Sequence, residues 1–415
     1  MKTRIFAALL VVLCLVSFSI SPAQAQNEIP IIDLGTLGGP ESIPFGMNDL
    51  GQVVGQSYAN AFLWDLKNGM QDLSQILGID QAIYINNQGQ VVGHKLGAAF
   101  LWSPSNGYIQ LTNTASYPGG VNDLGQVVGE FDVEIVNDGV TGKQKHAFLW
   151  SKDKGLQDLG TLAGNRMSSV AFAVGINDHG QVVGWSELPT TPFSHAFRWT
   201  QETGMQDLGF YVDFFTSELF INNNGEIAGS RYVDYFHQRG FLWTPEKGLI
   251  DLGTLSSLPD SQSRVRGFND QGQVIGSSDT ISGYAHAFLW TPEKGMQDLG
   301  TLGGNYSSAH DINKLGQIVG ESSLPSGERH AFLWTEKDGM IDLGTLEGGD
   351  SNAVGINNSG QIMGISDKFF GTDTGFRHAV LWQLPATYIT INIKIDIKPG
   401  SSTNPVNLGA RGVIP

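Results

Sequence analysis

Short apolar runs of four to six residues follow one another along most of the chain, and each run ends at a glycine, an asparagine or a charged residue. One stretch shows four such runs in order, over residues 171–176, 181–185, 195–199 and 205–208. Runs of this length that are rich in Val, Ile, Phe and Trp are typical of β-strands, and no helical periodicity competes with them. The pattern predicts a repeating unit of four short antiparallel strands.

Three signatures mark this unit. The turn from the first to the second strand reads Asn-x-x-Gly-(Gln/Glu)-(Val/Ile)-x-Gly, the third strand ends in Phe/Val-Leu/Arg-Trp, and the fourth contains Asp-Leu-Gly or a weaker version of it. The turn begins at Asn48, Asn86, Asn122, Asn177, Asn222, Asn269, Asn313 and Asn357. The copies are spaced by about 44 residues, and four strands in that length make one blade of a β-propeller.

The order of the strands predicts how the repeat closes. The chain enters the repeats at a lone fourth strand, over residues 31–34, and leaves them after a third strand at Trp382. Pairing these two strands would complete the last blade and cover two sheet edges. We therefore predict an all-β, closed β-propeller of eight four-stranded blades, the last completed by the N-terminal strand. Seven blades plus one irregular unit is the alternative, because the second and third units have the weakest signatures.

Together, the signatures resemble the HAF family of bacterial extracellular repeats. The resemblance extends over about residues 31–382 and rests on His-Ala-Phe-Leu-Trp, Gly-Met-Gln-Asp-Leu-Gly-Thr-Leu-Gly-Gly and Gly-Ile-Asn-Asp-His-Gly-Gln-Val-Val-Gly, at 146–150, 295–304 and 175–184. It implies an exported, propeller-like repeat protein. It implies no activity, so it assigns no catalytic residue.

The two ends of the chain differ from the repeats. Residues 1–25 have the positive start, the apolar run and the Ala-x-Ala site of a cleaved secretory signal peptide. We expect residues 26–385 to form the propeller. Residues 386–415 are similar to the opening of a β-rich C-terminal module of secreted bacterial proteins, and we expect them to be the truncated start of such a module. No other segment is long and apolar enough to span a membrane, so we expect a protein that is secreted or held at the cell surface.

Composition narrows the range of partners. The formal net charge is −16, with 24 Lys and Arg against 40 Asp and Glu, which argues against nucleic acid as a partner. The only cysteine, Cys14, lies in the signal peptide, so the mature chain has no thiol for a disulfide or a metal site. The 54 glycines suit many tight turns between strands. We expect a monomer.

Hydrogen bonds within the repeating scaffold are the first explanation for the polar residues that recur in the blades. Five histidines stand at one repeat position, where a hydrogen bond made once per blade accounts for them better than a shared metal ion does. The turn asparagines suit Asx turns, and the repeated aspartate of the fourth strand suits acceptance of backbone hydrogen bonds. Gly-x-Ser recurs without the second glycine of a hydrolase elbow. We expect no catalytic residue, no metal site and no cofactor.

Link lengths point to one face of the ring. The first-to-second turn never changes length, whereas the second-to-third and fourth-to-first links vary, and antiparallel order places both variable links on one side. We call this side the variable face. Binding residues commonly lie in variable loops on a rigid scaffold. The candidate ligand-binding patch lies within residues 210–237, which are rich in aromatic residues, and comprises Tyr211, Asp213, Tyr232, Asp234, Tyr235 and His237. A locally repacked core is the alternative explanation.

A second irregular stretch, residues 130–145, contains several carboxylates of the kind that bind calcium. Their spacing matches no calcium loop, so we expect a mobile, solvated loop. The sequence favours an exported, non-catalytic binding or surface-interaction module whose ligand is an unidentified extracellular glycan or protein. A polysaccharide-active hydrolase or lyase and a structural spacer of an extracellular layer are the alternatives.

Overall fold

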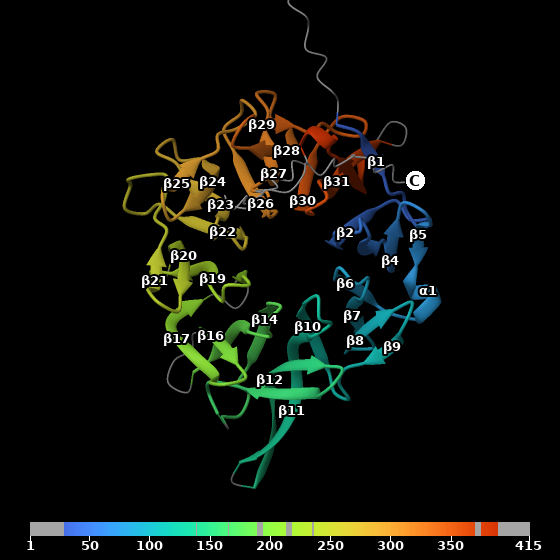
Figure 1. Ribbon diagram of the computed structural model, residues 1–415, viewed down its shortest axis with the longest axis vertical. Helices are drawn as coiled ribbons and strands as arrows, with labels where there is room; N and C mark the ends of the chain where they lie inside the picture. The colour runs from blue at the N-terminus through green and yellow to red at the C-terminus, as the bar shows by residue number, and fades with distance from the viewer. Residues whose placement is uncertain are drawn as a thin grey trace, which may run out of the picture.

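Eight four-stranded antiparallel sheets form a ring in the computed structural model of this chain (Figure 1). The structure describes residues 29–388 apart from residues 138, 165, 189–193, 213–217, 235 and 370–374. Residues 1–25, for which we predict a signal peptide, and almost all of the tail therefore lie outside the described residues. Strands make up the described part, with one short helix, α1 (Leu73–Leu77), and one 3-10 turn, η1 (Ala386–Tyr388). The prediction of an all-β propeller with eight blades is confirmed, and the seven-bladed alternative is wrong.

Strand order follows chain order from the innermost strand outward in seven sheets, and the eighth has β1 as its outermost strand (Figure 1). Blades 1 to 4 comprise β2 (Ser42–Met47), β3 (Val53–Ser57), β4 (Asn60–Asp65), β5 (Gly69–Asp72); β6 (Gln81–Ile85), β7 (Val91–Lys95), β8 (Ala98–Ser103), β9 (Gly107–Gln110); β10 (Ser116–Val121), β11 (Val127–Asn137), β12 (Val140–Ser151), β13 (Gly155–Gly160); and β14 (Ala171–Ile176), β15 (Val182–Glu187), β16 (Ser194–Thr200), β17 (Gly204–Val212).

The other four blades have the same order. Blades 5 to 8 comprise β18 (Leu219–Ile221), β19 (Ile227–Tyr232), β20 (Gln238–Thr244), β21 (Gly248–Asp251); β22 (Ser263–Phe268), β23 (Val274–Asp279), β24 (Ala285–Thr291), β25 (Gly295–Asp298); β26 (Ser307–Ile312), β27 (Ile318–Ser323), β28 (Arg329–Thr335), β29 (Gly339–Asp342); and β30 (Ser351–Ile356), β31 (Gln361–Phe369), β32 (Gly375–Gln383) with β1 (Ile31–Asp33).

Strand β1 closes the ring, as predicted. It pairs antiparallel with β32, with Ile31 opposite Trp382 and Asp33 opposite Val380. The Asp33 carboxylate lies 2.6 Å from Lys368 Nζ and 2.9 Å from His378 Nδ1. Hydrogen bonds and ion pairs therefore add to the short backbone ladder that joins the two ends of the repeat region.

Apolar side chains fill the space between neighbouring blades. One such cluster joins Val128 and Leu149 of blade 3 to Ala171 and Phe197 of blade 4, all of them buried. The second glycine of the turn signature is explained by a close approach within the blade, because a Cβ atom on Gly184 of β15 would lie 2.1 Å from the backbone oxygen of Phe172 on the neighbouring strand β14. The first glycine has a different role, since Gly180 has φ +71°, a conformation that favours glycine.

Most of residues 130–145 belong to the paired strands β11 and β12, where an irregular loop was expected. The ladder between β11 and β12 continues from Val127 opposite Trp150 to Asn137 opposite Val140, and the hairpin projects from the ring (Figure 1). Lys145 lies 2.8 Å from Glu130 and 3.4 Å from Asp132. The carboxylates at the base of the hairpin therefore pair with a lysine.

No helix within the described residues has the length and apolar character needed to cross a membrane.

Candidate functional site

Asparagine side chains organise one end of the central channel. Each of the eight turn asparagines accepts backbone hydrogen bonds with its Oδ1 atom, as in blade 3, where the N–H groups of Leu124 and Gln126 donate to Asn122 at 3.2 and 2.9 Å. The side-chain Nδ2 of Asn122 also donates to Gln126 Oε1 at 2.7 Å. The Asx-turn role predicted for these residues is confirmed.

The same asparagines also link every blade to the next, a role that sequence reasoning missed. Each Nδ2 donates to the backbone oxygen of the asparagine in the following blade at 2.8 to 3.4 Å. The bond from Asn357 to Asn48 completes the circle. We call this closed set of eight bonds the asparagine ring. A clue was present in the repeats, because an Asx turn alone would accept Asp, whereas only Asn supplies both the acceptor and the donor.

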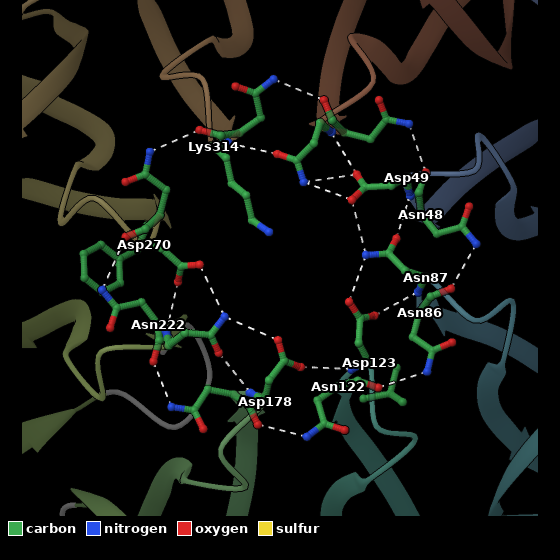
Figure 2. Close-up of a pocket in the computed structure, with 18 of the residues that line it drawn as sticks. Asn48, Asp49, Asn86, Asn87, Asn122, Asp123, Asp178, Asn222, Asp270 and Lys314 are labelled. Atoms are coloured by element: carbon green, nitrogen blue, oxygen red, sulfur yellow. Dashed lines mark hydrogen bonds between the residues drawn. The ribbon is translucent and has the colours of Figure 1, made fainter. Parts of the chain in front are cut away.

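A second set of hydrogen bonds lies beside the first (Figure 2). The residue after each asparagine donates its backbone N–H to the side chain of its counterpart in the next blade at 2.7 to 3.2 Å, in seven of eight cases. The break falls between Asp270 and Lys314, because a lysine cannot accept. These residues are Asp49, Asn87, Asp123, Asp178, Asn223, Asp270, Lys314 and Asn358.

The two sets surround a cavity of about 380 Å³ at this mouth of the channel. Its walls are the turn residues and the last residue of each inner strand. Within the described ranges, no cluster of three or more His, Cys, Asp or Glu side chains could hold a metal ion. Most polar atoms at this mouth are hydrogen-bonded to one another. We therefore assign the mouth to the scaffold.

The repeated histidines are hydrogen-bonded within their own blades, which confirms the role expected for them. Each places Nδ1 2.8 to 2.9 Å from the aspartate of the outer strand. The pairs are His146–Asp158, His195–Asp207, His286–Asp298, His330–Asp342 and His378–Asp33. In blade 5, Arg231 contacts the equivalent aspartate, Asp251, at 3.0 Å.

The serines of the recurring Gly-x-Ser also belong to the scaffold. Their Oγ atoms accept a backbone N–H at 2.9 Å from a leucine in the link that precedes the blade. The leucine–serine pairs are Leu37–Ser57, Leu162–Ser186, Leu255–Ser278, Leu302–Ser322 and Leu346–Ser366. These hydroxyls therefore join neighbouring blades, as expected of residues that lack the hydrolase elbow.

The predicted patch is partly core and partly surface. Phe210 and Val212 are buried, and Phe210 packs against Phe241 with ring centroids 4.6 Å apart. Tyr211 is 42% exposed and lies edge-on to His195 at 4.7 Å. The alternative of local repacking therefore accounts for Phe210 and Val212.

The remaining residues of the patch lie in blade 5. Tyr232 ends β19 and is partly buried, and Asp234 and His237 form an ion pair of 2.8 Å in the following link. The hydrogen bond from His237 holds the pKa of Asp234 below its usual value. Asp213 and Tyr235 lie outside the described residues. A ligand-binding role for the patch stays a prediction.

The opposite mouth of the channel differs from blade to blade, and sequence reasoning missed it. Inner strands of six residues span about 20 Å, so their first residues lie toward the variable face. Seven of them contain a bulge at the third residue before the turn asparagine. The fourth residue before the asparagine is buried in these blades, and the residues on either side of it vary. Aligning the repeats on their asparagines would have shown this variation.

Blades 1 to 4 present apolar and aromatic residues at these positions. Ile43, Phe45 and Tyr117 are 41%, 39% and 41% exposed. The Tyr117 ring lies 6.3 Å from the ring of Phe172 and 5.4 Å from that of His94. Burial, helped by the nearby Tyr117, raises the pKa of Tyr84 to about 12. This half of the mouth offers ring faces and uncharged hydroxyls.

Blades 6 to 8 present mainly polar and charged residues there, whereas blade 5 has the buried Leu219 and blade 8 also has Val354. Arg266 pairs with Glu218 of the previous blade at 2.8 Å. His310 Nδ1 lies 3.0 Å from the backbone oxygen of Ala353, and burial lowers the pKa of His310, so its ring is neutral at pH 7. Glu321 accepts from Tyr306 and from Arg329, each at 3.2 Å. These charged residues lie in blades 5 to 7, and further irregular ion pairs lie in blade 3, such as that of Lys145 with Glu130.

Comparison with known proteins gives only distant likenesses. No protein-family model and no curated protein matches the chain. Among solved structures, the Dos1 propeller is 10% identical, with a TM-score of 0.48, over 86% of this chain and 95% of that chain. A prolyl endopeptidase is 10% identical, with a TM-score of 0.49, over 82% of this chain and 54% of that chain. TolB from Acinetobacter baumannii is 10% identical, with a TM-score of 0.36, over 86% of this chain and 96% of that chain. Likenesses of this degree do not bear on function.

Proposed function

We propose that the chain is an exported, non-catalytic binding module of the HAF type, which holds an extracellular ligand on the variable face of the propeller. One observation supports this above all. The polar residues that recur in the blades already make hydrogen bonds within the scaffold. The residues that differ from blade to blade lie at the channel mouth on the variable face.

The regularity of the scaffold favours binding over catalysis. The histidine–aspartate pairs occur in five blades with nearly the same geometry, from 2.8 to 2.9 Å. A catalytic group normally occurs only once in a protein, because it must act on one bond of the substrate from one direction. A rigid ring with a varied mouth suits a preformed binding surface, since little ordering entropy is lost when the ligand binds.

Export and binding have separate tests. Expression of the full chain in a bacterial host, followed by N-terminal sequencing of the exported product, should give a chain that begins at Gln26. The mature protein should then sediment with a cell-surface fraction that contains wall polysaccharide and surface proteins. Retention of the chain in the cytoplasm with residues 1–25 intact would contradict export.

Variants locate the binding face. Replacing Tyr117 at the mouth with Ala should reduce sedimentation, and the double variant Tyr211→Ala and Tyr232→Ala tests the patch predicted from the sequence. Leu66→Ala is the matched control, because Leu66 is 79% exposed in the turn between β4 and β5 on the opposite face. If Leu66→Ala reduces binding as much as the other variants do, the variable face is not the binding surface.

A further inference from the structure

The hairpin of β11 and β12 has one covered edge and one free edge. Along β12, the backbone N–H of Lys145 donates to the backbone oxygen of Ser169 in the following link at 3.0 Å. Along β11, the pairing with β10 ends at Phe131. From there to Asn137, β12 is the only strand paired with β11 in the part of the chain that the structure describes. The end of β11 is therefore an exposed sheet edge on the hairpin that projects from the ring (Figure 1).

The backbone of this edge directs its hydrogen-bonding groups away from β12 at every second residue. Asp132 shows the direction, because its N–H donates to the oxygen of Ala115 at 2.8 Å and its oxygen accepts from Thr114 Oγ1 at 2.8 Å. The register with β12 is regular up to the turn of the hairpin, so the same groups of Glu134 and Val136 face the same way. Within the described ranges, neither residue has a partner on that side. Their N–H and C=O groups are thus available to an added strand.

The two faces of the free edge differ in their side chains. Phe131, Val133 and Ile135 lie on one face, and each is half-buried. Asp132 and Glu134 lie on the opposite face, because side chains alternate along a strand. An added strand would therefore place its own side chains alternately beside apolar groups and beside carboxylates.

Charge determines which added strand fits. The lysines of the hairpin lie in β12, on the far side of the acidic residues, where Lys145 lies 2.8 Å from Glu130 and 3.4 Å from Asp132. Glu134 is exposed, and although it lies opposite Lys143 in the ladder, it forms no ion pair with any described residue. A basic residue directly opposite Glu134 on the free side would continue the alternation of charge from strand to strand.

The same edge of a second copy of this chain fits poorly. Antiparallel pairing of two such edges about Val133 would place Asp132 opposite Glu134, and pairing about Glu134 would place this residue opposite its own counterpart. Like charges directly opposite each other destabilise a sheet, and charged side chains commonly protect edge strands from self-association. The acidic residues therefore favour a basic strand from another protein.

We propose that the free edge of β11 binds an extended peptide segment of another protein, in which basic residues alternate with apolar residues, by strand addition. The N–H and C=O groups of Glu134 and Val136 form the ladder, and the basic side chains lie beside Asp132 and Glu134. The apolar side chains pack on Val133 and Ile135. Because the hairpin is one of the second-to-third links of the variable face, the inference rests on the proposed function and names a partner for one part of that face.

The test is a calorimetric titration of the full mature chain with a short peptide in which Lys and Val alternate. A peptide of equal length with Glu in place of Lys should bind at least about tenfold more weakly. The Lys–Val peptide with methyl groups on the backbone nitrogens of its lysines should not bind, because these nitrogens face β11 when a lysine lies opposite Glu134. Amide hydrogen exchange within β11 should slow when the unmodified peptide binds.

Variants assign the binding to this edge. Val136→Pro removes an N–H that faces away from β12, so it should weaken binding by about fivefold or more without breaking the ladder of the hairpin. Glu134→Gln should weaken binding by roughly two- to fivefold. Lys152→Pro is the matched control, because it lies in the turn between β12 and β13 of the same blade, where blades 5 and 6 have Pro245 and Pro292. An unchanged melting temperature shows that each variant is folded.

The outcomes separate the two proposals. No binding of the Lys–Val peptide, equal affinity for the Glu–Val peptide, binding of the N-methylated peptide or full binding by Val136→Pro would each overturn the inference. A dimer of the chain that Val136→Pro dissociates would overturn it too, because the edge would then belong to a second copy. In all of these cases, sedimentation of the mature chain with the cell-surface fraction leaves the proposed function intact. If the chain binds neither the peptide nor that fraction, both proposals fail.

Discussion

Replacing one asparagine of the asparagine ring with either Ala or Asp separates its local role from its role between blades. Asn122 is 5% exposed and makes four hydrogen bonds: two accepted by Oδ1 within the turn, and two donated by Nδ2 to Gln126 and to the backbone oxygen of Asn177. Asn122→Ala removes all four. At about 1 kcal/mol for each bond, the free energy of unfolding should fall by roughly 3–4 kcal/mol.

Asn122→Asp is the more informative change. A carboxylate keeps both acceptor bonds of the turn, so a purely local role predicts a loss of under about 0.5 kcal/mol. It also removes the two donors: the Gln126 amide of the same turn can rotate and donate to the carboxylate, whereas the backbone oxygen of Asn177 in the next blade is fixed and faces another oxygen. If the ring stabilises the fold, this variant should lose at least about 2 kcal/mol.

Urea unfolding followed by tryptophan fluorescence measures both variants, with the slope of the transition checked for a change in cooperativity. Asn106→Asp is the control, because Asn106 is exposed in the turn between β8 and β9 and the chemical change is the same. An Asn122→Asp protein as stable as the parent would refute the idea that bonds between blades at this position hold the ring together.

Three further changes test other parts of the scaffold. Burial raises the pKa of Asp311 to about 6, so the folded state binds a proton more tightly than the unfolded state does. The free energy of unfolding should therefore fall as pH rises from about 4 to about 6. Asp311→Gly should flatten this part of the profile of melting temperature against pH. Lys314→Asn restores an acceptor for the backbone of Asp270, so the urea midpoint should rise by the equivalent of about 1 kcal/mol. Gly184→Ala should cost more than about 3 kcal/mol in the same assay or prevent folding, because the added Cβ would lie 2.1 Å from the oxygen of Phe172.

Features that repeat in every blade were predictable, because eight copies distinguish a constant requirement from chance. The strand order and the hydrogen-bonding role of the repeated histidines follow from such constancy, and the unmatched strand at residues 31–33 follows from the strand order. The hairpin at β11 and β12 occurs once, and its strand signal is the apolar alternation of Phe131, Val133 and Ile135 between carboxylates.

The candidate site was harder to predict for the opposite reason. Tyr211 was identified because aromatic residues cluster near it in the sequence, whereas Tyr117 and Arg264 are far apart in the chain and share only an equivalent place on their inner strands. A single inner strand shows nothing unusual. Only the comparison of one position across all blades shows that it changes from aromatic to charged.

The pairing of β1 with β32 sets an order of events in folding. The first strand of the repeat region is also the first to be synthesised, yet its partner begins at residue 375. Seven blades are complete before that partner exists, so the nascent chain is an open arc with one strand unpaired. Loop closure over so long a separation is slow, and we expect it to be the last step. A chain that ends before β32 would therefore stay an arc, open at both ends.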